Sequence, residues 1–318
     1  MTTQTTPVTA DNFARAETDM YFAVFSQGKV GVLAHHREPA NADNQKVVRD
    51  NPNVLGTVAV FDLDAGPVTL TLPDAGDRFM SLMITNEDHY TSTTYDSGAH
   101  VLSRDKLGTR YVFVAIRILV DPNDPADVAA VHALQDAMVL DQPGGPGTFD
   151  VPDWDRDSHD KVRNALITLG ETLTDANRMF GQPDQVDPVR HLIGAATGWG
   201  GNNEHDAFYA FAFPEHNDGE TVYRLTLRDL PIDSWWGVSV YNAAGYFEKN
   251  DRDIYTINSL NGVPDADGAY TIQFGGNADD AANCLPIFPN WNYAVRLYLP
   301  HQEVIDGSWT LPAAQPAP

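Results

Sequence analysis

The sequence predicts a mainly β protein with minor α content. We expect two antiparallel, jelly-roll-like β-sandwich or barrel domains, with a short N-terminal helix and further helices between the domains. Two observations carry this prediction. Short period-2 segments rich in bulky side chains recur along the chain, and turn signals such as Asn217-Asp218-Gly219 and Asp267-Gly268 separate them. The stretch 141–152, rich in proline and glycine, divides the strand-like regions into two groups.

The N-terminal region predicts one helix followed by strands. In residues 9–28, Thr9 can cap a helix, Gly28 ends it, and Phe13, Ala16, Met20 and Val24 recur at helical spacing. The strand expected at Arg110–Val120 is almost continuously apolar, which is typical of a central strand. The expected strands are Leu55–Asp62, Pro67–Leu72, Arg78–Thr85 and Arg110–Val120.

Helices are expected between the two strand-rich regions. Asp124-Pro125 opens one with proline in the first turn, and its apolar stripe is Val128, Val131, Leu134 and Met138. Beyond the irregular segment 141–152, we expect two short helices at Asp160–Leu169 and Asp175–Phe180.

The second strand-rich region begins at Asp206. In its last strand Trp291, Tyr293, Val295 and Leu297 share one face, and Asn292, Ala294, Arg296 and Tyr298 share the other. The aromatic group of Trp235, Trp236, Tyr241 and Tyr246 is expected to serve mainly in packing. The expected strands are Phe208–Phe213, Val222–Leu227, Trp236–Tyr241, Tyr255–Asn258, Tyr270–Phe274 and Trp291–Leu299.

Length and turn signals together predict five segments. These are an N-terminal helix or arm at 1–28, a first β-rich domain at 29–142, a helical linker at 143–198, a second β-rich domain at 199–312 and a disordered tail at 313–318. A chain of 318 residues is comfortable for two domains of ordinary size.

The charge balance excludes some classes of partner. With 20 basic and 44 acidic residues the net charge is −24, so the chain repels nucleic acid and anionic membranes. Such a surface suits high salt, although an acidic protein from a mesophile is the alternative. Cys284 is the one cysteine, and neither a signal peptide nor a membrane-spanning stretch is visible. We therefore expect a cytoplasmic protein.

The familiar catalytic and cofactor motifs are absent. The sequence has no Gly-x-Ser-x-Gly elbow, no His-Glu-x-x-His, no P-loop and no dinucleotide-binding Gly-x-Gly-x-x-Gly, so no cofactor and no metal are expected. Asp153, Asp155, Asp157 and His159 resemble the start of a calcium loop, but Ser158 and Asn164 replace its glycine and its glutamate. An acidic helix start is the better interpretation. The pair His35-His36 favours a loop over a metal site, because adjacent side chains diverge.

The motif Glu87-Asp88-His89-Tyr90 is the strongest candidate for chemistry. It follows the strand at 78–85 and places a carboxylate, an imidazole and a phenol within a few residues at a strand end. The alternative is a capped turn with a buried tyrosine.

Three further residues could line a pocket. Trp199 stands on a glycine-rich loop and could form a pocket wall or fill a seam between domains. Arg296 could hold an anion or serve as a buried ion-pair partner, with the structural role favoured. Tyr241 is the tyrosine that best suits a pocket hydroxyl.

The chain resembles the bacterial proteins that join the domains of unknown function 1254 and 1214. The resemblance rests on Phe61–Val68, Leu72–Gly76, Glu87–Tyr90 and Leu134–Ala137 in the first part, and on Gly198–Asn202, Ser239–Asn242, Gly245–Phe247, Asn290–Tyr293 and Asp306–Trp309 in the second. It implies two β-rich domains and no established reaction. Where similar proteins read Arg-x-Asn-x-Asp-Thr-Leu-Tyr-Ser, this chain has Asn53, Val54 and Gly56 in place of the Asp, Thr and Tyr, and it lacks their second cysteine near Asn277.

These features leave two hypotheses of function. The first is an enzyme that acts on a small organic molecule by hydrolase- or lyase-type acid–base chemistry, in a pocket at the domain junction. The second is a non-catalytic small-molecule-binding or self-assembling protein, and a homo-oligomer is expected because aromatic sandwiches expose edges and patches. For the enzyme, the catalytic residues would be Asp88, His89 and Tyr241, and the substrate-binding residues Asn51, Tyr90, Trp199 and Arg296.

Overall fold

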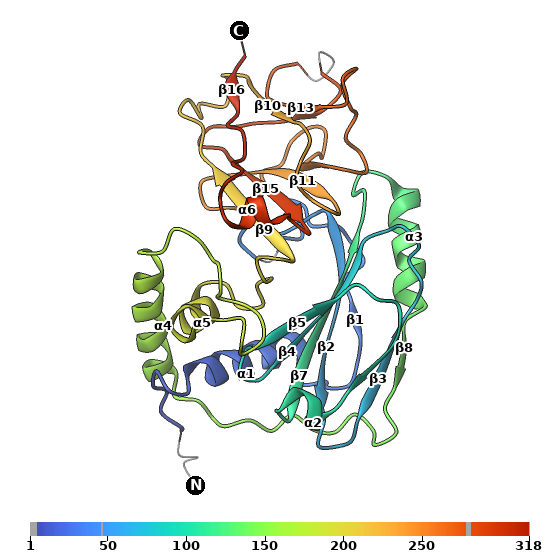
Figure 1. The fold of residues 1–318 in the computed structure, drawn as a ribbon, viewed down its shortest axis with the longest axis vertical. Helices are drawn as coiled ribbons and strands as arrows, with labels where there is room; N and C mark the ends of the chain where they lie inside the picture. Colours follow the sequence, from blue (N-terminus) through green and yellow to red (C-terminus); the bar gives the residue numbers. More distant parts are fainter. Residues whose placement is uncertain (1–4, 46, 278–280, 318) are drawn as a thin grey trace. The chain divides into compact units, whose positions relative to one another are not determined.

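The computed structural model describes residues 5–45, 47–277 and 281–317. Its chain forms two compact units (Figure 1). The first unit contains the chain up to His36, Gly56–Ile118 and Ala133–Glu204; the second contains Arg37–Leu55, Leu119–His132 and the chain from His205.

The first unit is built on a five-stranded and a three-stranded sheet. The larger sheet has the order β1-β2-β7-β4-β5 and the smaller β6-β3-β8, with antiparallel pairing in both. The nearly continuous apolar run of β7 lies centrally, as the sequence predicts, and most of its side chains are buried. The strands are β1 (Ala34–His35), β2 (Val54–Asp62), β3 (Val68–Leu72), β4 (Met80–Asn86), β5 (Thr91–Thr94), β6 (Gly98–Leu102), β7 (Tyr111–Leu119) and β8 (Val139–Asp141).

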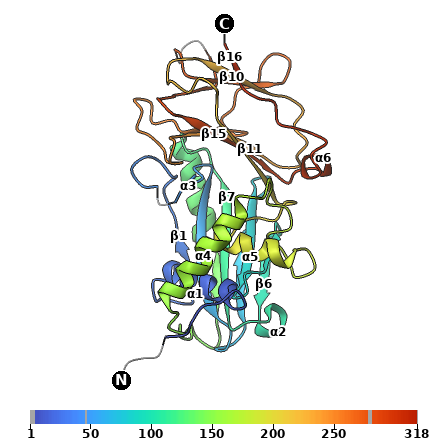
Figure 2. The ribbon, with the colours of Figure 1, turned by 90° about the vertical axis from the view of Figure 1, so that its left-hand side faces the viewer.

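Three helices pack together in this unit, as Figures 1 and 2 show: α1 (Phe13–Ser26), α4 (Arg156–Gly170) and α5 (Pro188–Thr197). The carboxylate of Asp155 caps α4 by accepting from Ser158 N, which confirms the acidic helix start. Asp187 caps α5, with Pro188 in its first turn. The chain also forms α2 (Arg104–Leu107) and α3 (Pro125–Asp136).

The prediction of a helix at Asp175–Phe180 is wrong. Those residues form turns and bends, and the helix lies later, at α5. Asp187-Pro188 supplies both the capping carboxylate and the proline that fixes the first helical φ, and the sequence analysis missed that signal. The apolar stripe predicted for α1 is also only partly right, since Val24 is 67% exposed while Glu17 and Asp19 are buried.

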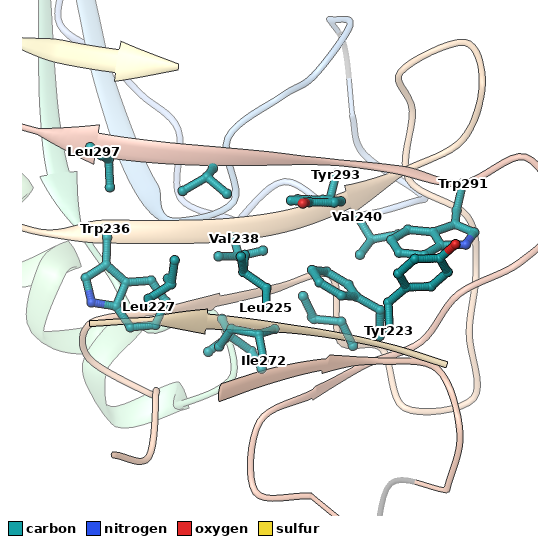
Figure 3. Close-up of a cluster of buried hydrophobic side chains, with 14 of the residues drawn as sticks. Tyr223, Leu225, Leu227, Trp236, Val238, Val240, Ile272, Trp291, Tyr293 and Leu297 are labelled. Carbon is teal, nitrogen blue, oxygen red and sulfur yellow. The ribbon is translucent and has the colours of Figure 1, made fainter. Parts of the chain in front are cut away.

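The second unit is a sandwich of two four-stranded sheets, β14-β13-β10-β16 and β12-β11-β15-β9. Apolar side chains from the two sheets meet between them, with Leu225 and Ile272 on one side and Val238 and Tyr293 on the other (Figure 3). This is the packing expected when each strand alternates core-facing and outward residues. The elements are β9 (Ala207–Ala212), β10 (Tyr223–Leu227), β11 (Trp236–Tyr241), β12 (Thr256–Asn258), β13 (Tyr270–Phe274), β14 (Cys284–Leu285), β15 (Asn292–Tyr298), α6 (Gln302–Ile305) and β16 (Gln315–Pro316).

The fold class is therefore mainly β with a short N-terminal helix, as predicted, and none of the sheets formed by the described residues closes into a barrel. The segment expected to be a helical linker, 143–198, groups with the first unit, because α4 and α5 share an apolar cluster with α1. Segments 37–55 and 119–132 group with the second unit, whereas the sequence boundaries assumed contiguous domains.

The segment 313–318, predicted to be a disordered tail, contains β16 at Gln315–Pro316; Pro318 lies outside the described residues. Gln315–Pro316 pairs with β10, and Ala317 N donates to Val222 O. Ala314 N donates to the Tyr293 hydroxyl. Backbone hydrogen bonding therefore orders a segment whose side chains carry no strand signal.

Within the part of the chain that the structure describes, no helix has both the length and the apolar character needed to cross a membrane.

The sandwich core makes a direct prediction about stability. Leu225 has no exposed surface and lies in the middle of the core. Leu225→Ala should lower the free energy of unfolding by about 3 kcal/mol, because a buried isopropyl group is lost and a cavity is left. Urea unfolding followed by tryptophan fluorescence measures this. Leu260→Ala, at a side chain 46% exposed, is the control and should change little; equal losses in both variants would contradict the assigned core.

Candidate functional site

The seven residues predicted for the site divide between the two units. Asp88, His89, Tyr90 and Trp199 belong to the first unit. Asn51, Tyr241 and Arg296 belong to the second.

The motif at the end of β4 forms a tight, capped turn. Asn86 Oδ1 accepts from the backbone N–H groups of Asp88 and Tyr90, at 3.0 Å each, and His89 N donates to Asn86 O. His89 itself has φ of 64°, in the left-handed region. The alternative interpretation, a capped turn with a buried tyrosine, describes the backbone, but the buried ring is that of His89 and Tyr90 is only half-buried.

His89 is completely buried in this turn. Its Nε2 accepts a hydrogen bond of 2.9 Å from Gly200 N, so the proton of the neutral ring resides on Nδ1, which has no hydrogen-bond partner among the described residues. The pKa of His89 is lowered to about 3, mainly by burial and to a smaller extent by the neighbouring His191. The imidazole is therefore neutral at physiological pH and has no contact with solvent.

Asp88 is engaged by an arginine rather than by His89. Its Oδ1 accepts from Arg15 Nε at 3.0 Å and from Nη2 at 2.6 Å. Glu87 lies on the other side of the same guanidinium, with Oε1 at 3.6 Å from Arg15 Nη1, and its Oε2 accepts from Tyr111 N. This arrangement ties α1 to the end of β4.

Trp199 and Tyr90 serve as packing surfaces. Trp199 stacks on Tyr21 with ring centroids 4.4 Å apart, and its Nε1 donates to Thr18 Oγ1. Tyr90 stacks on His191 at 4.7 Å with nearly parallel rings. Trp199 therefore fills space against α1 within its own unit.

The first unit also buries carboxyl groups that the sequence analysis did not select. Asp19 is 1% exposed; its Oδ2 accepts from Trp154 Nε1 at 3.0 Å, and its Oδ1 has no hydrogen-bond partner among the described residues. The pKa of Asp19 is raised to about 7: burial is the main cause, the hydrogen bond from Trp154 opposes it, and the nearby Glu87 adds to it. Glu17 pairs with His159 and Arg163, and burial raises the pKa of that carboxyl above its usual value.

The second unit places the other group on the outward face of the sheet β12-β11-β15-β9. Arg296 lies opposite Gly237 and Tyr209, and Asn292 lies opposite Tyr241, so these residues share the face that points away from the sandwich core. Segment 49–53 packs on this face through hydrogen bonds to Tyr241, Asn292, Arg296 and Tyr298. We call Arg49 and Arg296, with the groups that hold them, the arginine site.

Arg296 is 3% exposed and bonded only to neutral groups. Its Nη2 donates to Arg49 O at 2.7 Å and to the Tyr241 hydroxyl at 2.9 Å, and its Nη1 donates to Ser239 Oγ at 3.3 Å. The Tyr241 hydroxyl in turn donates to Asp50 O at 2.7 Å. Among the described residues no carboxylate forms an ion pair with Arg296.

Arg49 lies beside it with its guanidinium held on two sides. Its Nη1 donates to Asn292 Oδ1 at 2.6 Å, and its Cζ is 4.4 Å from the centroid of Phe211 and 5.6 Å from that of Tyr241. Its Nε and Nη2 have no hydrogen-bond partner among the described residues. Burial is the main cause that lowers the pKa of Arg49; Tyr241 opposes this effect and the charge of Arg296 adds to it.

Asn51 and Asn53 belong to the polar layer, the name we use for segment 49–53 together with the outward-facing polar side chains to which it bonds. Asn51 Nδ2 donates to the Tyr298 hydroxyl, and Asn53, fully buried, accepts through Oδ1 from Thr256 and Asn258. A Cβ at Gly237 would lie 2.8 Å from Asn53 Nδ2, so the glycine leaves room for this side chain.

A cavity of about 70 Å³ borders this polar layer at Thr256. It is small compared with ligand pockets, which start at about 300 Å³. It is lined by Pro39, Ala40, Asn41, Pro52, Pro122, Asn123, Asp253, Tyr255 and Thr256.

Four residues of these two sites are not predicted from the sequence: Arg49, Phe211, Glu17 and Asp19. Strand β9 carries aromatic residues on both faces, so its period does not say which face is outward. The buried acids of α1 could have been found only from the tertiary contacts, because they interrupt the apolar pattern. Among the described residues, no group of three or more histidine, cysteine or acidic side chains is arranged to hold a metal ion.

Fold and site together define a two-domain, mainly β protein whose polar sheet face is covered by a segment from earlier in the chain. Residues 30–106 match the domain of unknown function 1254, and residues 211–302 match the domain of unknown function 1214. The chain therefore belongs to the family of proteins that join these two domains.

Two solved structures share the fold. The VPA0106 protein from Vibrio parahaemolyticus is similar with a TM-score of 0.76 and 16% identity, over 97% of this chain and 98% of that chain. An uncharacterised protein from Burkholderia cenocepacia is similar with a TM-score of 0.50 and 12% identity, over 92% of this chain and 84% of that chain. No curated protein matches the chain.

Asp19 should give the protein a measurable pH dependence. Its pKa rises to about 7 on folding, so the folded state binds a proton more tightly than the unfolded chain. Stability is therefore highest below about pH 4 as far as this group is concerned, and falls by on the order of 4 kcal/mol as the pH rises through about 7. Asp19→Asn keeps a neutral side chain and should be the more stable form at about pH 8.

The measurement is urea unfolding of both proteins across this pH range. The exposed Asp11→Asn is the matched control and should leave the profile unchanged. A profile for Asp19→Asn as steep as that of the natural chain would show that Asp19 is not the titrating group.

Proposed function

We propose that this chain is a non-catalytic binding protein for a small organic anion, held at the arginine site of the second unit. The observation that carries the proposal is the guanidinium of Arg49. Asn292, Phe211 and Tyr241 fix its position, and its Nε and Nη2 lack hydrogen-bond partners among the described residues. The Nε–Nη2 edge of a fixed guanidinium matches the two oxygens of a carboxylate.

Charge supports an anion as the ligand. Elsewhere in this acidic chain arginines pair with carboxylates, as Arg110 does with Asp62 and Arg190 with Asp175. Arg49 and Arg296 instead bond to amide, carbonyl and hydroxyl oxygens. Arg296 is buried without a counter-ion, which is costly, and an anion bound at the neighbouring half-buried Arg49 would relieve part of that cost.

The geometry favours binding over acid–base catalysis. An enzyme using Asp88 and His89 as its acid–base pair remains the other hypothesis, but His89 is buried and held neutral, and Asp88 is paired with Arg15. At the arginine site the Tyr241 hydroxyl already donates to Asp50 O and accepts from Arg296. Among the residues that the structure describes, no group at this site is poised to move a proton to or from a ligand.

From the sequence we further propose that the protein is cytoplasmic and forms a homo-oligomer. If an acidic side chain of a second copy supplied the missing anion, Arg49→Gln would change the oligomeric state, which sedimentation measures.

The direct test replaces the guanidinium. Exchanging chloride for acetate at constant ionic strength should stabilise the natural chain, by about 1.4 kcal/mol when acetate reaches roughly ten times its dissociation constant. Arg49→Gln should lose this difference, and Arg49→Lys should keep part of it, because lysine retains the charge without the two-pronged edge.

Thermal unfolding provides the readout, with each variant compared with itself in the two salts. Arg104→Gln, which removes an exposed arginine paired with Asp64, is the matched control and should respond as the natural chain does. An acetate effect that survives Arg49→Gln, or is absent from the natural chain, would refute the proposed site.

A further inference from the structure

A row of exposed aromatic side chains runs along the arginine site. Tyr209, Phe211 and Phe213 alternate along the edge strand β9 and its end, and they are 36%, 50% and 64% exposed. The residues between them, such as Phe208 and Ala212, pack on the sandwich core. The row therefore lies on the same sheet face as Arg296.

Arg49 joins this row to the polar layer. Its guanidinium carbon is 4.4 Å from the centroid of Phe211 and 5.8 Å from that of Phe213, and the rings hold it by cation–π contact. Phe213 is the most exposed member of the row, so its ring has the most surface free for a further contact. A charged group and a flat apolar surface thus lie side by side.

We propose that the ligand class is an aromatic carboxylate. Its carboxylate would bind the Nε–Nη2 edge of Arg49, and its ring would lie against Phe213. Bidentate N–O distances of about 2.8 Å place the ring centroid of such a ligand roughly 7 Å from Cζ of the arginine. The Phe213 centroid is 5.8 Å from the same carbon, so a ligand ring on the Phe213 side of the guanidinium would come within the roughly 4.5–7 Å that aromatic pairs favour.

This inference rests on the proposed anion site, but it makes a claim of its own about the shape of the ligand. The row consists of rings, and a planar ring can offset-stack or meet them edge to face, whereas a saturated ring of the same size gains only buried area. Benzoate and cyclohexanecarboxylate separate these contributions, because both carry one carboxylate and a six-membered ring.

The experiment is calorimetric titration of the natural chain with benzoate, cyclohexanecarboxylate, acetate and the uncharged benzamide. Benzoate should bind about fivefold more tightly than cyclohexanecarboxylate, and benzamide should not bind measurably. Phe213→Ala should weaken benzoate by about fivefold and leave acetate unchanged. Val101→Ala, a matched change at a residue 49% exposed in the first unit, should alter neither. Circular dichroism checks that both variants are folded.

The outcomes separate the two proposals. Equal binding of benzoate and cyclohexanecarboxylate, or benzoate binding that Phe213→Ala leaves intact, would overturn the aromatic ligand and leave the anion site standing. If none of the carboxylates binds, the anion site falls and the aromatic ligand falls with it. Binding of benzamide as tight as benzoate would also overturn the inference, since Arg49 would then have no part in recognition.

Discussion

The charge of Arg296, buried without a carboxylate, is the constraint on which the second unit depends. The guanidinium is 3% exposed and bonds to the backbone oxygen of Arg49, to Ser239 and to Tyr241. Removing such a charge from water costs several kcal/mol unless hydrogen bonds or a counter-ion compensate it. Segment 49–53 supplies carbonyl acceptors, and Arg49 has φ of 56°, a left-handed conformation that few side chains adopt without compensation. The strained backbone and the buried charge therefore belong to one arrangement.

The two faces of a single sheet explain how a stable core and a polar site coexist. On β15, Tyr293, Val295 and Leu297 point into the sandwich, while Asn292 and Arg296 point outward. The core face supplies the apolar burial that holds the sheet in place. The outward face can then carry groups that would destabilise a core, because the strands that position them are already fixed. In the first unit Asp19 is also buried, but it lies in a helix cluster, and among the described residues only its Oδ2 accepts a hydrogen bond, from Trp154.

Patterns with strong local causes could be read from the sequence. Alternation along residues 291–298 predicts both faces of β15, and the apolar run at 110–120 predicts a central strand; both are confirmed. The α1 stripe fails at Val24, because Glu17 and Asp19 find partners in distant segments that no periodicity reveals. The helix at 175–180 fails because the capping signal lies at Asp187-Pro188. The structure brings Arg296 and Tyr241, both predicted for the site, into contact, and Arg49 joins them through tertiary contacts made by an irregular segment that no pattern in the sequence reveals.

The central claim is that Arg49 presents a fixed, unpaired edge to an anion. The most direct measurement follows the Nε–H signals of the arginines by ¹⁵N NMR while benzoate is added at constant ionic strength. The account predicts a saturable shift of the Arg49 signal, while the signal of Arg110, which is paired with Asp62, stays in place. A small shift shared by all exposed arginines, or no shift at Arg49, would contradict it.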